Sequence, residues 1–401
     1  MVIKPRIRGF ICTTAHPQGC AENVRRQIDF VKSHGVGEGQ SIKNVLVLGC
    51  SAGYGLASRV VSSFALGANT LGVSFEKEPA EKKTASAGWY NNIAFDQFAK
   101  DHGFYSRTIN ADAFADATRE NVISIIKQEM DKIDLVVYSL ASPVRQHPKD
   151  GLLYRSSIKP MESVLQIKTV HVEKGEVSEI TLEPATEEEA KSTVAVMGGE
   201  DWEYWIDALA EADLLAEGAK TISYTYIGSK LTWPIYWDGT LGLAKADLDR
   251  ASRAISEKLT TIGGKAQVAV LKAIVSQASA AIPVVPLYVA LLFRVMKRMN
   301  LHEDCITHIY RLFATQLLDG VEQRLDDEGR IRMDDLELRP EVQKVVSQNW
   351  LKVTTENLDE LGDLEGFRSD FLNIFGFGFD EIDYELDVDP KRIFDSGLET
   401  R

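Results

Sequence analysis

Residues 44–55 read NVLVLGCSAGYG, and this stretch decides the fold. Its first five residues, Asn44–Leu48, form a short apolar run rich in β-formers, as expected of a buried parallel strand. The glycine-rich turn that follows leads into a helical pattern that continues through Leu66. A strand, a glycine-rich turn and a helix place backbone N–H groups where they can bind a pyrophosphate. The stretch therefore predicts a dinucleotide site, although a tight turn that needs glycine for steric reasons would read the same way.

Three further strands are predicted over residues 70–75, 104–109 and 134–138. Glu76 follows the first of them, 21 residues after Gly55, where dinucleotide-binding folds place an acid on the adenosine ribose. A carboxylate there repels a 2′-phosphate and favours NADH over NADPH, whereas the adjacent Lys77 would partly accept a phosphate. A solvated loop acid is the alternative interpretation of Glu76. Strands alternating with helical stretches predict an α/β fold with a Rossmann-like doubly wound parallel sheet.

The charge is unevenly distributed along the chain. The 401 residues carry 45 Lys and Arg against 59 Asp and Glu, which gives a net charge of −14. Residues 1–300 hold 34 of each sign, so residues 301–401, with 11 basic and 25 acidic side chains, carry the entire excess. We expect no nucleic-acid partner, because the chain has an acidic excess and no recognition motif.

Several other features limit the class of protein. Residues 278–295 form the most apolar stretch, but two prolines and Arg294 interrupt it, and it is shorter than the ~20 residues of a membrane helix. We therefore expect no membrane insertion. Four cysteines and no signal peptide predict a cytoplasmic protein with free thiols. Cys12, His16 and Cys20 are evenly spaced but no second ligand cluster follows, so we expect no metal.

A tyrosine paired with a lysine is the usual acid of short-chain reductases, in which the Lys ammonium lowers the pKa of the phenol and holds the nicotinamide ribose. The candidate pairs are Tyr226 with Lys230, Tyr236 with Lys245, and Tyr288 with Lys297. Spacing alone does not choose among them.

Context favours Tyr236 with Lys245. Tyr226 closes a β-like run over residues 221–226, and Gly228 interrupts any helix leading to its lysine. Tyr288 lies in an apolar helix whose basic end contains the third lysine. Nine steps of about 100° put two residues on opposite sides of a helix. Tyr236 must therefore lie before the helix that carries Lys245, and a turn at Gly239 permits this.

Taken together, these segments resemble the V-type enoyl-acyl-carrier-protein reductases and the related trans-2-enoyl-CoA reductases. The similar segments are KPRIRGFI (4–11), HPQGC (16–20), GCSAGYGLASR (49–59), GVSFEK (72–77), GWYNN (88–92), DLVVYSLASPVR (134–145), VMGGEDW (196–202), Tyr236-x8-Lys245 and QASAAIPVVPLY (277–288). They cover nearly the whole chain.

The resemblance implies Tyr236 as proton donor, Lys245 on the cofactor ribose and Tyr226 as a second hydroxyl at the substrate's thioester carbonyl. The residues that it implies for NADH are Gly49, Cys50, Ser51, Ala52, Gly53, Tyr54, Phe75, Glu76, Asp112, Ala113, Leu140, Ala141, Lys245, Ile274, Val275 and Ser276. Threonine is the more expected residue at the last of these positions, which leaves the fine cofactor preference open.

The implied activity is NADH-dependent reduction of the carbon–carbon double bond of trans-2-enoyl thioesters in fatty acid biosynthesis. The substrate would be enoyl-acyl-carrier protein, enoyl-CoA or both, and the enzyme a monomer without metal. Whether Tyr236 protonates the substrate or only polarises its carbonyl is left open. The alternatives are a ketone or alcohol dehydrogenase that uses Tyr226 and Lys230, and a non-catalytic NAD(H)-sensing module.

We expect a single integrated domain over residues 1–401. Its predicted parts are a dinucleotide-binding half (44–145), an insertion or cap (146–220), a catalytic and substrate-binding region (221–300) and an acidic helical extension (301–401). A hairpin is predicted over residues 171–182, and an amphipathic helix with Trp202 and Trp205 would either cap the acyl pocket or pack on the domain flank. Arg294, Lys297 and Arg298 share one helix face, which suits CoA phosphates, an acidic carrier or solvent equally. The FGFGF run at 375–379 is expected to dock.

Overall fold

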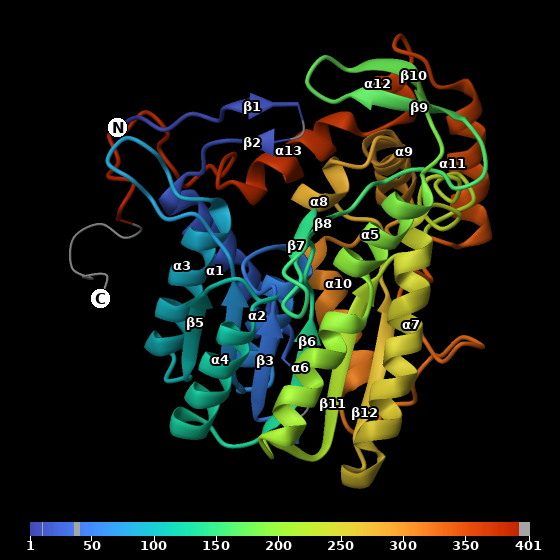
Figure 1. Ribbon diagram of the computed structural model, residues 1–401. Coiled ribbons are helices and arrows are strands. Elements are labelled where there is room, and N and C mark those ends of the chain that lie inside the picture. Colours follow the sequence, from blue (N-terminus) through green and yellow to red (C-terminus); the bar gives the residue numbers. More distant parts are fainter. Residues whose placement is uncertain (10, 36–40, 393–401) are drawn as a thin grey trace.

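A seven-stranded parallel sheet forms the centre of the molecule (Figure 1). The computed structural model describes residues 1–9, 11–35 and 41–392, so Phe10 of the KPRIRGFI segment and the end of the 301–401 extension lie outside it. From one edge to the other the strands are β5 (Ser106–Asn110), β4 (Asn69–Ser74), β3 (Asn44–Leu48), β6 (Ile133–Tyr138), β11 (Leu215–Thr225), β12 (Lys265–Val270) and β13 (Ile331–Arg332). The strand order reverses beside β3, so the predicted doubly wound sheet is confirmed.

The four strands predicted first are all present, and each begins within two residues of its predicted start. β3 is buried along its whole length. Because successive side chains of a strand point to opposite faces, Val45 and Val47 enter one hydrophobic core and Leu46 and Leu48 the other. A strand buried on both faces therefore reads as a continuous apolar run.

Helices cover both faces of the sheet (Figure 1). The core that contains Leu46 is closed by α4 (Asp116–Glu129), α6 (Glu200–Glu211) and α7 (Thr240–Leu259). The helices that contribute to the other core are α1 (Pro17–His34), α2 (Gly53–Phe64), α3 (Ala87–Asp101), α9 (Val285–Arg298), α10 (Cys305–Leu312), α11 (Pro340–Lys352) and α13 (Leu364–Ile374). The remaining short helical elements are η1 (Thr260–Ile262), α8 (Gln277–Ala280), the π-helix η2 (Phe313–Leu317) and α12 (Leu358–Leu361).

The insertion between β6 and β11 contains two hairpins and two helices. They are β7 (Val144–Gln146) with β8 (Leu153–Arg155), β9 (Leu165–His171) with β10 (Glu176–Leu182), α5 (Glu187–Met197) and α6. The predicted hairpin over 171–182 is present, but its first strand begins earlier, at Leu165. Its Lys168 ammonium donates to the carbonyls of Trp350, Leu351 and Val353, where α11 ends.

The two tryptophans of α6 settle where that helix lies. Trp202 and Trp205 are fully buried, and their indole N–H groups donate to Thr221 Oγ1 at 2.8 Å and to the Ala113 carbonyl at 3.1 Å. Both belong to the core under α4 and α7. Of the two interpretations of this helix, packing on the domain flank is therefore the one that the structure supports.

The segment from Phe375 to Asp387, within the C-terminal extension, packs against the start of the chain. Phe375, Phe377 and Phe379 are buried, so the FGFGF run docks as predicted. Acids of the following segment pair with N-terminal cations: Glu381 with Arg26, Glu385 with Lys4, and Asp387 with the Met1 ammonium. A short hairpin, β1 (Ile7–Arg8) and β2 (Ile11–Cys12), belongs to the same N-terminal arm.

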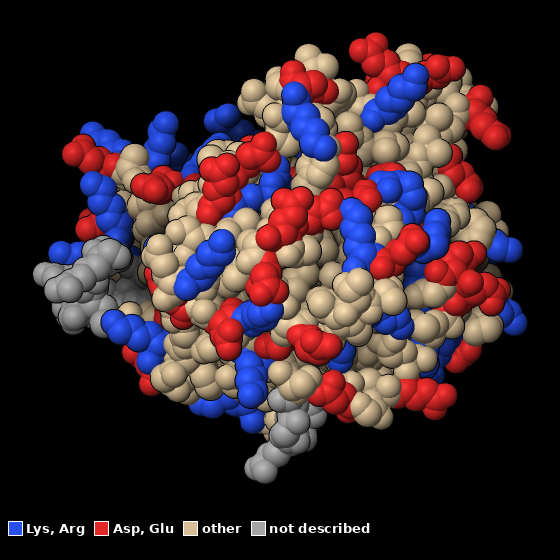
Figure 2. Space-filling view, turned by 60° about the horizontal axis from the view of Figure 1, so that its bottom comes forward, with Lys and Arg blue, Asp and Glu red and all other residues tan. Residues whose placement is uncertain are grey.

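The surface charges are mixed rather than segregated on the face that Figure 2 shows. There Lys and Arg are interspersed with Asp and Glu, and no continuous basic patch is visible. Over the described ranges, no helix is long and apolar enough to cross a membrane.

Candidate active site

The predicted site residues follow the carboxyl ends of six strands. Residues 49–54 follow β3, 75–76 follow β4, 112–113 follow β5, 140–141 follow β6, 226 follows β11 and 274–276 follow β12. Because the strands are parallel, these ends share one edge of the sheet, at the top of Figure 1. Ligands of open α/β sheets bind at this edge, next to the point where the strand order reverses.

The glycine-rich turn fits a pyrophosphate. Gly49 has a φ of +85°, and a Cβ there would lie 2.2 Å from the Ser139 carbonyl oxygen. A Cβ on Gly55 would lie 1.9 Å from the Gly49 carbonyl oxygen, so glycine is required at both positions. α2 begins at Gly53, and its N-cap residue, Ala52, has no side-chain acceptor. The N–H groups of the first turn of α2 therefore remain available to a phosphate.

Glu76 is held rigidly beside this turn. Its carboxylate accepts hydrogen bonds of 2.5 Å from the hydroxyls of Ser51 and Ser86. A Cβ on Gly88 would lie 2.2 Å from Glu76 Oε1, so only glycine allows that helix to approach. The solvated-loop interpretation of Glu76 is therefore disfavoured. Sequence reasoning missed Ser86 and the reason for Gly88, although the GWYNN segment contains the latter.

The remaining residues expected to bind NADH border the same edge with different exposure. Phe75 is 77% exposed, and Asp112 Oδ1 accepts from the Phe114 N–H at 3.0 Å. Ile274 and Val275 are buried. Ser276 caps α8, its hydroxyl accepting from the Ser279 N–H at 3.0 Å. Ala113 is buried, Leu140 is half-buried and Ala141 is exposed. A hydroxyl is what the cap requires, and a threonine at 276 would supply it equally well.

Tyr236 lies before α7, as the spacing requires. Its N–H donates to the Thr232 carbonyl at 3.0 Å within a series of turns, and Gly239 is the N-cap of α7. Its ring is buried and meets the Tyr226 ring edge-on, with centroids 5.0 Å apart and planes at 84°. The Tyr236 hydroxyl has no hydrogen-bond partner within the described part of the chain.

The two other Tyr–Lys pairs are engaged elsewhere. Lys230 is exposed, whereas the Tyr226 hydroxyl donates to Glu337. The Tyr288 hydroxyl donates to the same carboxylate, and Lys297 pairs with Asp363 at 2.6 Å. Neither pair therefore offers a hydroxyl that is free of other partners.

The expected lowering of the tyrosine pKa is contradicted. Burial raises the pKa of Tyr236 above its ordinary value. Lys245 keeps some contact with solvent, yet burial of its ammonium lowers its pKa to about 8, opposed by the charge of Asp249. The cost of removing ions from water exceeds any help that the ammonium gives to a phenolate here. Tyr236 is therefore a neutral hydrogen-bond donor at neutral pH.

Tyr54 connects the glycine-rich turn to the segment after β12. Its hydroxyl donates to the Lys272 carbonyl at 2.6 Å, at the end of β12. Burial raises the pKa of Tyr54 well above its ordinary value.

Glu337 is the principal residue that sequence reasoning missed. It is fully buried and follows β13, five residues after Arg332. Its Oε1 accepts from the hydroxyls of Tyr226 and Tyr288, at 2.9 and 2.7 Å. Its Oε2 accepts from the Ala273 N–H at 2.6 Å. No sequence signal could have found it, because the strand that it follows, β13, has only two residues and is too short to recognise.

The basic face of α9 serves the C-terminal extension. Arg294 donates to the carbonyls of Gly362 and Asp359, and Lys297 pairs with Asp363. These two side chains join α9 to the segment around α12. Arg294 and Lys297 are therefore engaged within the chain, whereas Arg298, the third residue of the predicted basic face, is exposed.

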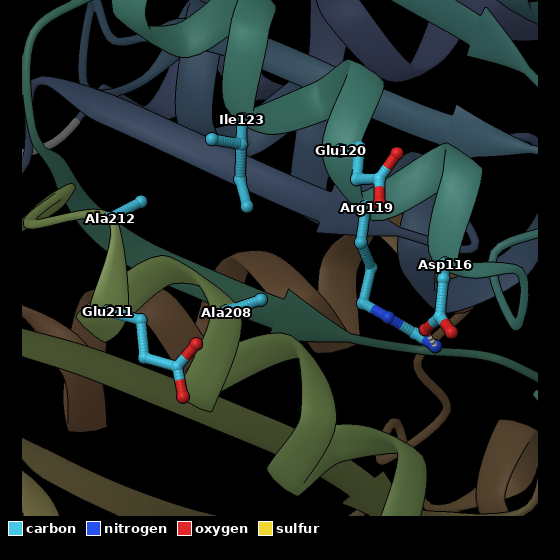
Figure 3. Close-up of a pocket in the computed structure, with 7 residues that line it drawn as sticks. All are labelled: Asp116, Arg119, Glu120, Ile123, Ala208, Glu211 and Ala212. Atoms are coloured by element: carbon cyan, nitrogen blue, oxygen red, sulfur yellow. Dashed lines mark hydrogen bonds and ion pairs between the residues drawn. The ribbon is translucent and has the colours of Figure 1, made fainter. Parts of the chain in front are cut away.

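A surface groove of about 440 Å³ lies between α4 and α6 (Figure 3). Its lining side chains are Asp116, Arg119, Glu120, Ile123, Ala208, Glu211 and Ala212. Arg119 is itself buried and pairs with Asp116 and Asp201, which leaves the acids dominant. Such a groove does not suit an anionic cofactor. Across the residues that the structure describes, no cluster of His, Cys, Asp or Glu is arranged to hold a metal.

Three family models together match nearly the whole chain. The model described as the trans-2-enoyl-CoA reductase catalytic region matches residues 83–318. The model described as the NAD(P)H binding domain of trans-2-enoyl-CoA reductase matches residues 2–81, and one described as the enoyl reductase FAD binding domain matches residues 325–388.

Individual proteins are similar over their full length. The chain is 52% identical over 397 residues to the enoyl-[acyl-carrier-protein] reductase [NADH] of Aliivibrio fischeri (strain MJ11), covering 98% of this chain and 99% of that protein. It is 54% identical over 396 residues to the same enzyme of Tolumonas auensis, with the same coverage. The crystal structure of Clostridium acetobutulicum trans-2-enoyl-CoA reductase in complex with NADH superposes with a TM-score of 0.94 at 43% identity, over 98% of each chain. The Treponema denticola trans-2-enoyl-CoA reductase in complex with NAD gives 0.93 at 48% identity, over 100% of each chain.

Residues 325–388 do not fit a flavin dinucleotide of their own. Their one strand, β13, is followed by Asp334, Asp335 and Glu337 rather than by a glycine-rich turn and a helix. Acids at that place repel a diphosphate. Through Glu337 the segment instead contacts Tyr226 and Tyr288.

Proposed function

Because the chain belongs to the family of trans-2-enoyl-CoA reductases and NADH-dependent enoyl-[acyl-carrier-protein] reductases, we propose that it reduces trans-2-enoyl thioesters with NADH in fatty acid biosynthesis. The observation that carries this function is the Tyr236 hydroxyl. It is a neutral donor without a partner in the described chain, at the sheet edge that holds the glycine-rich turn and the fixed Glu76.

The chain's own residues divide the work of binding. The N–H groups at the start of α2, with residues 49–54, bind the pyrophosphate. Glu76 accepts the ribose hydroxyls and repels a 2′-phosphate, which favours NADH over NADPH. Phe75, Asp112 and Ala113 border the adenine. Leu140, Ala141 and residues 274–276 line the nicotinamide end, where Lys245 holds the ribose.

NADH, when bound, supplies the hydride that the β-carbon of the enoyl thioester receives. Negative charge then develops on the thioester carbonyl oxygen, and the Tyr236 hydroxyl donates a hydrogen bond to it. Loss of one such donor typically costs about 3–4 kcal/mol of transition-state stabilisation. A phenol whose pKa is raised is a weak acid. Tyr236 therefore acts chiefly by polarising the carbonyl, and the α-carbon of the enolate afterwards takes its proton from solvent.

The carrier is acyl-carrier protein, CoA or both, and the enzyme acts as a monomer in the cytoplasm. Free thiols support the reducing compartment, since all four cysteines lie in the described ranges and none is in a disulfide. Size-exclusion chromatography with light scattering tests the monomer, and a dimer mass would refute it.

The test of the activity follows NADH absorbance with three substrates in turn: crotonyl-CoA, crotonyl-acyl-carrier protein and a simple ketone. We expect oxidation of NADH with at least one of the two thioesters and none with the ketone. Turnover of the ketone alone would support a dehydrogenase that uses Tyr226 and Lys230. NADH binding without any turnover would support a sensing module.

A further inference from the structure

A buried carboxylate from the C-terminal extension joins three elements of the site. Glu337 receives hydrogen bonds from Tyr226 at the end of β11, Tyr288 on α9, and the Ala273 N–H beyond β12. The side chain of Gln343 donates to the backbone carbonyl of Glu337 at 2.8 Å and to the Tyr288 hydroxyl at 3.1 Å. These bonds hold Glu337 further in place. Three donors converge on two carboxylate oxygens.

The direction of these bonds sets the role of Tyr226. A phenol has one O–H, and that of Tyr226 is donated to Glu337. Burial raises the pKa of Tyr226 far above its ordinary value, and the charge of Glu337 raises it further, so the phenol keeps its proton. While this bond stands, Tyr226 has no proton to offer a substrate carbonyl. Its ring edge instead bears on the Tyr236 ring.

The space around Tyr226 leaves it little freedom to turn. A Cβ on Gly228 would lie 2.7 Å from the Tyr226 ring and 2.4 Å from Thr232 Oγ1, so the backbone closes over the ring. Gly228 also has a φ of +75°. The ring is therefore fixed by packing on one side and by the Glu337 bond at its hydroxyl.

The same carboxylate fixes the neighbouring backbone. Ala273 immediately precedes residues 274–276, which are proposed to line the nicotinamide. The bond from its N–H to Glu337 Oε2, at 2.6 Å, anchors that segment to the C-terminal extension. The Glu337 side chain thus fixes both Tyr226, which packs against Tyr236, and the backbone that precedes residues 274–276.

From this geometry we infer that Glu337 is a positioning residue for the reductase reaction, which aligns Tyr236 through Tyr226 and leaves Tyr236 as the single donor to the substrate carbonyl. This inference rests on the proposed function. It also gives residues 325–388 a task in the site that requires no flavin.

The test is Glu337→Gln. A glutamine has one acceptor oxygen, so at least one of the three buried donors loses its partner. Because small misplacements of a catalytic group cost up to about 100-fold in rate, we expect kcat with crotonyl-CoA to fall by about 10- to 100-fold. The KM and the dissociation constant for NADH should change less than kcat does, because the glycine-rich turn and Glu76 are untouched and only the anchor of residues 274–276 is weakened.

The matched control is Asp334→Asn, in the same loop. Asp334 is equally buried and pairs with Arg332, but has no contact with the tyrosines. It should keep kcat within about threefold even if its melting temperature falls. An equal loss of kcat in both variants would refute the inference, because loop packing would then explain it.

A double-mutant cycle with Tyr226→Phe tests the route. If Glu337 acts through Tyr226, the double variant loses little more than the worse single variant. Multiplied losses, or kcat within threefold of wild type in Glu337→Gln, would overturn the inference. If that variant does not fold, Glu337→Asp keeps the charge but withdraws the carboxylate by one methylene. It should lower kcat at least threefold, and wild-type kcat would again refute the inference. Absence of turnover in the wild type would instead refute the proposed function.

Discussion

Tyr236→Phe removes one oxygen atom and leaves the ring in place. The Tyr236 ring is 8% exposed, and its hydroxyl is bonded to no described residue, so the change creates no orphaned donor or acceptor. We expect the free energy of unfolding to change by less than about 1 kcal/mol. In the proposed mechanism the same atom is the donor to the developing oxyanion. A loss of about 3–4 kcal/mol there corresponds to a fall in kcat of at least about 100-fold.

The assay pairs turnover with binding. Loss of NADH absorbance with crotonyl-CoA gives kcat, and quenching of tryptophan fluorescence gives the NADH dissociation constant, which should change less than about twofold. Tyr105→Phe is the matched control, because it also removes one hydroxyl, which donates to Glu129 beside the amino end of β5. Near-normal turnover in Tyr236→Phe would refute the assignment of the donor. A parallel loss of NADH binding would refute the separation of the two roles.

Two further predictions concern the cofactor. The pKa of Lys245 is lowered to about 8, so the ammonium that we propose holds the ribose loses its proton near that pH. We therefore expect kcat/KM to fall as pH rises through about 8, and Lys245→Arg to lack this fall. The contribution of Lys245 to stability changes with pH in the opposite direction. Between pH 8 and 10.5 the unfolded chain, in which the Lys pKa is 10.5, binds more protons than the folded chain, so this contribution rises across that window. A flat profile of kcat/KM against pH would contradict the expected fall in activity. Glu76→Gln keeps hydrogen-bonding capacity toward Ser51 and Ser86 but removes the charge, so the KM for NADPH should fall at least about tenfold in initial-rate measurements, and an unchanged preference for NADH would contradict the role of the carboxylate.

The central sheet was predictable because its signal is local. β3 combines a five-residue apolar run with a glycine-rich turn, and burial on both faces produces that pattern directly. Glu76 was predictable for a related reason, since the length of one β-α-β unit fixes its distance from the turn. The order Tyr236, turn, helix, Lys245 followed from helix geometry once context had favoured this pair.

Glu337 could not be predicted in this way. Its strand, β13, has two residues, and its partners Tyr226 and Tyr288 are 111 and 49 residues away in the chain. No local period marks such contacts. The pKa of Tyr236 was missed for another physical reason: residue types show which charges are near, but only packing shows how far a phenol and an ammonium have lost water.

The basic face of α9 shows the limit of helical periodicity. The spacing correctly placed Arg294 and Lys297 on one helix face. It did not predict which segment that face contacts. The structure shows that it meets the carbonyls and acids around α12. Part of the acidic excess of residues 301–401 is thus neutralised by cations from the first 300 residues.

The position of Glu337 late in the chain has a consequence for assembly during folding. The dinucleotide-binding strands β3, β4, β5 and β6 all lie within the first 138 residues and pair with one another. The acceptor for Tyr226 arrives only when residue 337 docks, across a separation of 111 residues. Because a chain is synthesised from its N-terminus, the four strands are available before residue 337. The part of the fold that we propose binds the cofactor can therefore form before the part that aligns Tyr236. Nucleotide binding by a folding intermediate would then not imply a competent enzyme.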